Sequence, residues 1–105
     1  MTAFNSVRFR VKPGHDDEFV ELFRSAPRNF DGLRNMVLVK SGDGAFFSIG
    51  EWETFQHMVD ARSKMVGNLD RFRHTLEQHL DGGHTDAVSG DTVFEMSVRG
   101  GDRSA

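Results

Sequence analysis

The side chains best suited to acid–base chemistry in this sequence are five histidines, in a chain of 105 residues that has neither cysteine nor tyrosine. His74 follows Asp70 by four residues, and His57 precedes Asp60 by three, so each histidine has an aspartate at helical spacing. A histidine near its ordinary pKa of about 6.5 can accept a proton at neutral pH. His74 and His57 are therefore the candidate catalytic bases, with plain surface pairs as the alternative interpretation.

Other classes of site have little support in the sequence. His74 and His79 are five residues apart, which separates them by about 140° around a helix and disfavours a shared metal ion. The lack of cysteine excludes thiolate ligands and thiol catalysis. There is no phosphate-binding loop, Ser-His-Asp arrangement or paired-carboxylate signature. We therefore expect no metal and no cofactor.

Composition limits the partners. A formal net charge of −3 and a pI near 5.9 lack the basic patch that nucleic-acid binding needs. No apolar run approaches the length of a membrane span, and the first residues do not resemble a signal peptide. These features predict a cytoplasmic protein that binds neither nucleic acid nor membrane. Ten phenylalanines predict an aromatic core.

The elements that must position these side chains are clearest in the middle of the chain. Two strand-like runs, residues 33–40 and 45–52, flank the turn-forming residues 41–44 (Ser-Gly-Asp-Gly) and predict a β-hairpin. A helix is predicted directly after the hairpin, with Thr54 as its cap. Its apolar stripes extend to Leu80, with a break expected near residues 67–68 (Gly-Asn).

The flanking segments complete a single domain over residues 1–105. Residues 3–11 alternate in polarity as a strand does, and an acid-led helix with an apolar stripe follows residues 13–14 (Pro-Gly). Near the C-terminus we expect a loop over residues 84–91 and a last strand over residues 92–98. The core should span about 3–98, and 100–105 should form a flexible tail.

The predicted order is strand, helix, strand, strand, helix, strand. This order indicates an α+β, ferredoxin-like βαββαβ fold, in which a four-stranded antiparallel sheet carries both helices on one face. The central runs at 36–39 (Met-Val-Leu-Val) and 46–49 (Phe-Phe-Ser-Ile) are apolar on both faces. Since the helices cover only one face, the open face predicts a homodimer in which two sheets pair.

Three short motifs carry a resemblance to a known family. They are VKPG at 11–14, FDGL at 30–33 and EWET at 51–54. With them, residues of about 5–98 resemble the antibiotic biosynthesis monooxygenase superfamily of dimeric α/β barrels. This resemblance implies a pocket between the sheet and the helices, and it implies a cofactor-independent monooxygenase acting on a small aromatic or quinol-like substrate. Trp52 stands at the position of the family's tryptophan after the third strand.

In that interpretation Asn5, Trp52 and Phe72 bind the substrate, while His74 or His57 takes a phenolic proton. The alternative is a non-enzymatic small-ligand-binding or interaction module with the same fold. Haem degradation is disfavoured, because the position of that branch's asparagine is Val7 here and the second helix has no tryptophan.

Overall fold

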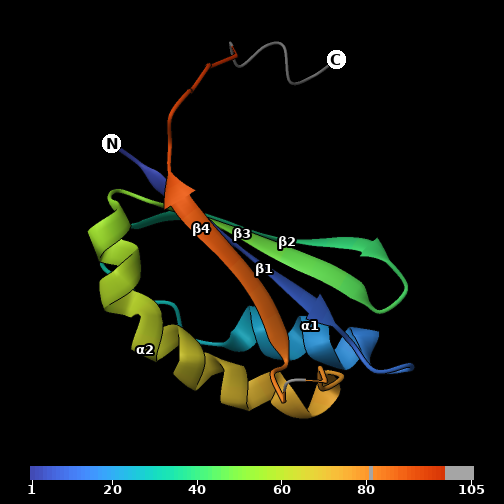
Figure 1. Cartoon of the computed structure of the whole chain (residues 1–105). Coiled ribbons are helices and arrows are strands. Elements are labelled where there is room, and N and C mark those ends of the chain that lie inside the picture. The colour runs from blue at the N-terminus through green and yellow to red at the C-terminus, as the bar shows by residue number, and fades with distance from the viewer. Residues whose placement is uncertain (81, 99–105) are drawn as a thin grey trace.

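The computed structural model describes residues 1–80 and 82–98 of the chain, so the tail predicted at 100–105 lies outside the described residues. In chain order the elements are β1 (Ala3–Arg10), α1 (Asp16–Ser25), β2 (Leu33–Gly42), β3 (Ala45–Trp52), α2 (Phe55–Phe72), the 3₁₀ turn η1 (Arg73–Thr75) and β4 (Thr85–Asp91). Figure 1 shows their arrangement.

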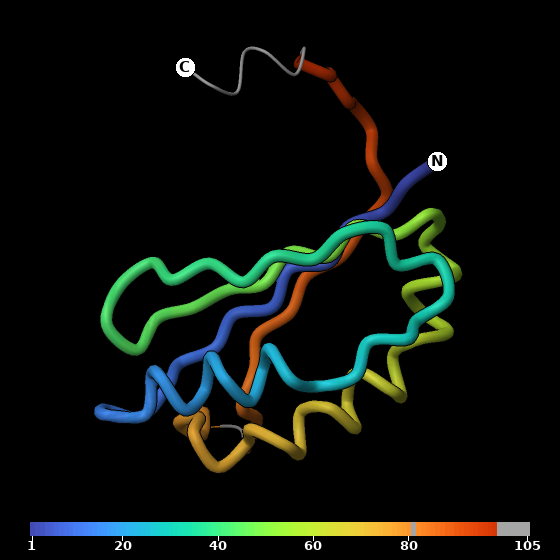
Figure 2. The backbone as a smooth tube through the Cα atoms, turned by 180° about the vertical axis from the view of Figure 1, so that it is seen from behind, coloured from blue at the N-terminus to red at the C-terminus, as the bar shows by residue number. Residues whose placement is uncertain are grey.

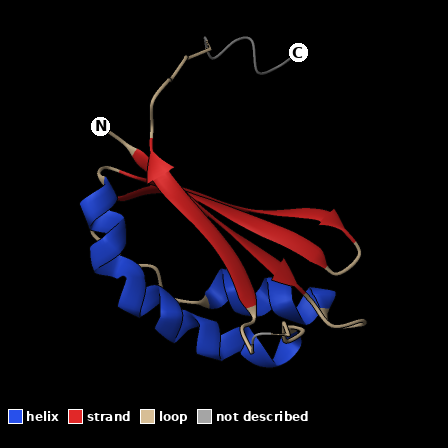
Figure 3. Cartoon of the chain, in the orientation of Figure 1, coloured by secondary structure: helices blue, strands red, loops and turns tan. Residues whose placement is uncertain are grey.

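The four strands form one antiparallel sheet in the order β2-β3-β1-β4. Both helices pack on the same face of this sheet (Figures 1 and 3). The register places Phe9 of β1 between Phe46 of β3 and Thr85 of β4, so that the three side chains share the helix-covered face. The predicted ferredoxin-like fold is confirmed.

Local chemistry explains the two helices. Three acidic residues occupy the first turn of α1, where they favour the positive end of the helix dipole. The Thr54 hydroxyl caps α2 by accepting a hydrogen bond from the backbone N–H of His57. Phe19 of α1 and Phe72 of α2 meet Phe9 of β1, with ring centroids 5.2 to 5.9 Å apart, and these rings centre the core.

The second helix is shorter than predicted. It runs through Gly67 without a break, and it ends at Phe72 rather than near Leu80. After η1 the chain turns back to β1, where Leu76 forms a bridge with Val11 and is buried. The prediction mistook Leu76 and Leu80 for a continuing helical stripe; Leu80 is in fact exposed.

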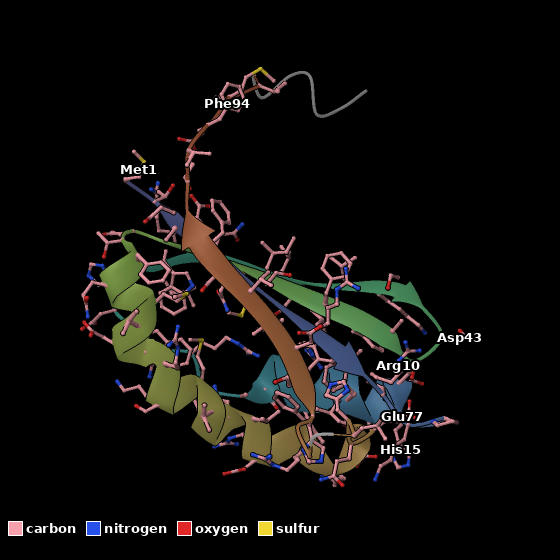
Figure 4. All side chains as sticks on the ribbon, viewed as in Figure 1. Met1, Arg10, His15, Asp43, Glu77 and Phe94 are labelled. Carbon is pink, nitrogen blue, oxygen red and sulfur yellow. The ribbon has the colours of Figure 1, made fainter. Side chains whose placement is uncertain are left out.

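The last strand was also predicted wrongly. The segment expected to be a loop, 84–91, contains β4 (Thr85–Asp91), whereas the expected strand at 92–98 is not a strand. Because α2 ends early, the chain reaches the sheet early, and backbone pairing with β1 forms a strand from small and polar residues. The chain then continues away from the sheet (Figure 2), and Figure 4 shows Phe94 on this extended segment.

The sheet face opposite the helices exposes apolar side chains. Phe4, Val37 and Val88 are 39%, 43% and 70% exposed, and Ile49 and Phe47 lie on the same face with partial exposure. None of the described helices combines the length and the apolar composition that a membrane-spanning helix requires.

Candidate functional site

A cavity of about 440 Å³ lies between the helix-covered face of the sheet and α2. Its size falls in the range typical of small-molecule sites. The lining comes from all four strands, from both helices and from the segment between α1 and β2, and it is mainly apolar. The largest apolar groups are four phenylalanine rings and three methionines: Phe9, Phe23, Phe30, Phe72, Met36, Met58 and Met65.

The α2 side of the cavity follows from helical spacing. Met58, Arg62, Met65, Leu69 and Phe72 recur at intervals of three or four residues, which places them along one side of the helix. All five line the cavity. Four are apolar, and Arg62 introduces a positive charge among them.

A buried polar pair lies beside the cavity on the sheet. The Trp52 indole Nε1–H donates a hydrogen bond to Asn5 Oδ1 at 2.8 Å, and the Trp52 side chain is fully buried. An indole N–H can only donate, so this bond fixes the orientation of the Asn5 amide. Asn5 lines the cavity, whereas Trp52 lies behind it and stacks on Phe30, with ring centroids 6.0 Å apart. The bond leaves Asn5 Nδ2 as the donor that a ligand can use.

Gly50 makes room for this pair. It is the register partner of Asn5 on the neighbouring strand β3, facing the helices between Ser48 and Trp52. A Cβ atom at position 50 would lie 2.5 Å from Asn5 Oδ1 and 3.2 Å from Trp52 Nε1. The glycine is therefore required by the close approach of two side chains, not by a turn.

The charged side chains that line the described part of the cavity are Arg28 and Arg62, with no Asp, Glu, Lys or His among its lining residues. Arg28 stands over the Phe23 ring at 4.2 Å and donates from Nη1 to the Ala26 carbonyl at 3.0 Å. Burial lowers the pKa of the Arg28 guanidinium below its ordinary value. An arginine still remains protonated, so the cavity has a positive wall.

The two candidate histidines lie elsewhere. His74 Nε2 donates to Glu18 Oε2 at 2.9 Å, and His15 Nδ1 donates to Glu18 Oε1 at the same distance, so this cluster joins η1 to α1. These hydrogen bonds, that of His74 first, lower the pKa of the Glu18 carboxyl. His57 packs on Gly32, and its Nδ1 lies 2.7 Å from Thr54 Oγ1. Neither His57 nor His74 is among the residues that line the cavity.

The structure thus brings Asn5 and Phe72 to the cavity wall and places Trp52 directly behind Asn5. Sequence reasoning missed Arg28 and Arg62. The spacing of Arg62 between Met58 and Met65 could have placed it on the cavity side of the helix. Arg28 could not be placed in this way, because it lies between α1 and β2 in an irregular segment without a periodic pattern. In the described part of the chain, no three His, Asp or Glu side chains are grouped to hold a metal ion.

The family model described as antibiotic biosynthesis monooxygenase matches residues 3–78. No functionally curated protein matches the sequence.

Solved structures share the fold at low identity. SnoaB from Streptomyces nogalater, described as a cofactor-independent oxygenase, aligns with a TM-score of 0.71 and 16% identity over 90% of this chain and 96% of that one. Rv0793 from Mycobacterium tuberculosis aligns with a TM-score of 0.72 and 14% identity, over 92% and 100% of the two chains. A dimeric ferredoxin-like protein from an uncultured marine organism aligns with a TM-score of 0.73 and 10% identity over 93% of each chain. At these identities the likeness establishes the fold alone.

Proposed function

The chain belongs to the antibiotic biosynthesis monooxygenase family, and we propose that it is a cofactor-independent monooxygenase of a small aromatic or quinol-like substrate. The observation that carries this proposal is the cavity between the sheet and α2, whose wall combines phenylalanine rings with the oriented amide of Asn5. A flat aromatic molecule would stack on the rings, and Asn5 Nδ2 would donate to one of its oxygens. The oxygenase among the structures of the same fold adds support.

The proposed reaction is the oxidation of a phenol by molecular oxygen. The substrate loses its phenolic proton, and the resulting anion transfers electrons to O₂. One oxygen atom forms the new quinone carbonyl, and the other leaves as water with the two hydrogens that the substrate loses. For 1-naphthol the products are 1,4-naphthoquinone and water. In this scheme Asn5 holds the substrate oxygen, and the buried Trp52 fixes the direction of the Asn5 amide.

The reaction requires a group that accepts the phenolic proton. A general base must reach the phenolic proton directly or through one water molecule. His74 and His57 stay proposals for this role, to be tested by replacing each with alanine and using His79→Ala, at an exposed histidine with no proposed role, as the control. A loss of activity in His74→Ala or His57→Ala alone would assign the base. Unchanged rates in both variants would remove the histidine mechanism.

Oxygen consumption with 1-naphthol tests the activity itself. The proposal predicts enzyme-dependent uptake of O₂ and the appearance of 1,4-naphthoquinone that contains one ¹⁸O atom when ¹⁸O₂ is supplied. Ala87→Phe, which places a ring on the edge strand at the cavity wall, should suppress both signals. Oxygen uptake that is equal with and without the protein would contradict the proposal for this substrate class.

A second function is favoured by one observation. No carboxylate or imidazole lines the cavity among the described residues, so a ligand could be bound there without a nearby base. The chain would then be a binding module for small aromatic molecules. Saturable binding of 1-naphthol without any oxygen uptake would favour this function over the oxygenase.

We also propose that the chain forms a homodimer through the open face of its sheet. Phe4, Val37 and Val88 expose apolar surface there, and burying it would be favourable. The extended segment 92–98 adds exposed apolar groups, with Val93 and Phe94 at 95% and 77%. A structure of the same fold is described as dimeric, which supports pairing.

A further inference from the structure

The cavity has a charge of opposite sign to that of the whole chain. The net charge of the protein is −3, yet the charged side chains that line the described cavity are two arginines. Neither Arg28 nor Arg62 forms an ion pair with a carboxylate in the part of the chain that the structure describes. By contrast, Arg24, Arg34 and Arg73 each have an acidic partner. The charges of the two cavity arginines are therefore not neutralised by an ion pair within the described residues.

The Arg28 guanidinium is held in place without being neutralised. The Phe23 ring lies on one side of it at 4.2 Å, and the Ala26 carbonyl accepts one of its N–H groups. The segment that carries Arg28 is tied to α2, because Asn68 Nδ2 donates to the Pro27 carbonyl at 2.7 Å. A guanidinium has five N–H donors, and one is used here, so the others can bind an external acceptor.

Arg62 brings a second charge from α2. Met58 and Met65 lie on the same side of the helix as Arg62 and line the same cavity, and no carboxylate of the described residues forms an ion pair with the Arg62 guanidinium. Both cations belong to a partly apolar site, where an opposite charge is attracted more strongly than in open water.

We propose that Arg28 and Arg62 form an anion-binding subsite and that the aromatic ligand of this cavity bears a negatively charged oxygen group. This inference rests on the proposed function, since it names the charge class of the molecule that stacks on the phenylalanine rings. A phenolate or an aromatic carboxylate meets the requirement. For a phenol, the same field would favour the deprotonated form that reacts with oxygen, so the arginines would supply part of the role expected of a base.

Calorimetric titration with three ligands of one size tests the subsite. The ligands are 2-naphthoate, 2-naphthalenemethanol and 2-naphthylmethylamine, which present an anion, a neutral group and a cation on the same ring system. We expect the wild-type protein to bind the anion about tenfold or more tightly than the neutral alcohol, since charge-assisted hydrogen bonds are the stronger ones. The amine should bind most weakly, and added salt should weaken only the binding of the anion.

Two variants and a matched control assign the effect to residues. Arg28→Met keeps a long side chain over Phe23 but removes the charge. Arg62→Gln removes the charge at an exposed position of α2, where the fold should tolerate the substitution. Each should reduce the preference for 2-naphthoate severalfold while leaving binding of the neutral alcohol nearly unchanged. Arg71→Gln, an exposed α2 arginine outside the cavity lining, should keep the wild-type preference.

The outcomes separate this inference from the proposed function. Equal binding of the anion and the alcohol by the wild-type protein would overturn the anion subsite and leave the aromatic cavity intact. A preference that survives in both Arg28→Met and Arg62→Gln would also overturn the assignment. Failure of all three ligands to bind would overturn the aromatic-ligand function, and the subsite with it.

Discussion

Asn5 and Trp52, which are 47 residues apart in the sequence, form a hydrogen bond of 2.8 Å in the protein interior. The antiparallel register of β1 and β3 brings them together, and Gly50 leaves the space that the bond occupies. Asn5 belongs to the cavity wall, and Trp52 packs in a hydrophobic cluster with Met58 and Ala61. This one bond therefore connects the packing of the fold to the orientation of a polar group at the site.

Asn5→Ala should destabilise the protein by about 1–3 kcal/mol, because the buried Trp52 N–H loses its acceptor. Urea denaturation followed by circular dichroism gives the free energy of unfolding. Asn35→Ala, at an exposed position of β2, is the control and should change it by less than about 0.5 kcal/mol. Equal effects of the two substitutions would show that the Asn5–Trp52 bond adds nothing to stability.

Gly50→Ala should destabilise the fold by about 1–3 kcal/mol, because the new methyl group would overlap Asn5 Oδ1 and force a shift. Gly67→Ala is the matched variant, which should instead stabilise the fold. Nothing lies within 4 Å of a Cβ atom at position 67 in α2, and alanine favours a helix by up to about 1 kcal/mol over glycine. Thermal melting should show opposite signs for the two variants; a Gly50→Ala protein as stable as wild type would contradict the close packing.

Asp16 provides a test of pH dependence. The backbone N–H of Gly44 first, and then Lys40, hold the pKa of the Asp16 carboxyl below its ordinary value of 3.8. A lowered carboxyl pKa gives stability that is present above pH 3.8 and is lost as the pH falls through the folded-state value.

Asp16→Asn should accordingly lower the urea midpoint at pH 7, and its difference from wild type should shrink as the pH falls below 3.8. Asp17→Asn is the control, because it removes a charge from the same helical turn at an exposed residue whose side chain has no hydrogen-bond partner among the described residues. A difference between Asp16→Asn and wild type that stays constant down to pH 2 would argue against the lowered pKa.

The proposed dimer predicts that Ile49→Glu yields a monomer, because Ile49 lies on the open face of the central strand β3 and a charge there would be buried on pairing. Light scattering after size exclusion should give twice the chain mass of 11.8 kDa for wild type and the single chain mass for the variant. Val20→Glu, on an exposed helix position, should stay dimeric. A wild-type monomer at micromolar concentration would contradict the dimer.

The hairpin and α1 could be predicted because their signals are local, namely glycine and aspartate between two apolar runs and acids ahead of Phe19. The strand β4 could not, because its residues have little strand propensity and its hydrogen bonds come from β1, about 80 residues away. Likewise Asn5 and Trp52 could be named separately, but their bond depends on the strand register. The position of Arg28 depends on the segment after α1, which carries no periodic pattern.

The central claim is that the cavity between the sheet and α2 holds an aromatic ligand, and an NMR titration tests it most directly. The side-chain amide of Asn5 gives a pair of ¹⁵N-coupled proton signals, which can be followed as 2-naphthoate is added to labelled protein. We expect these signals to shift in a saturable way, together with the backbone amides of Met65 and Phe72 on α2. Saturable shifts confined to the open sheet face, around Val37 and Ile49, with no change at Asn5, would contradict the claim.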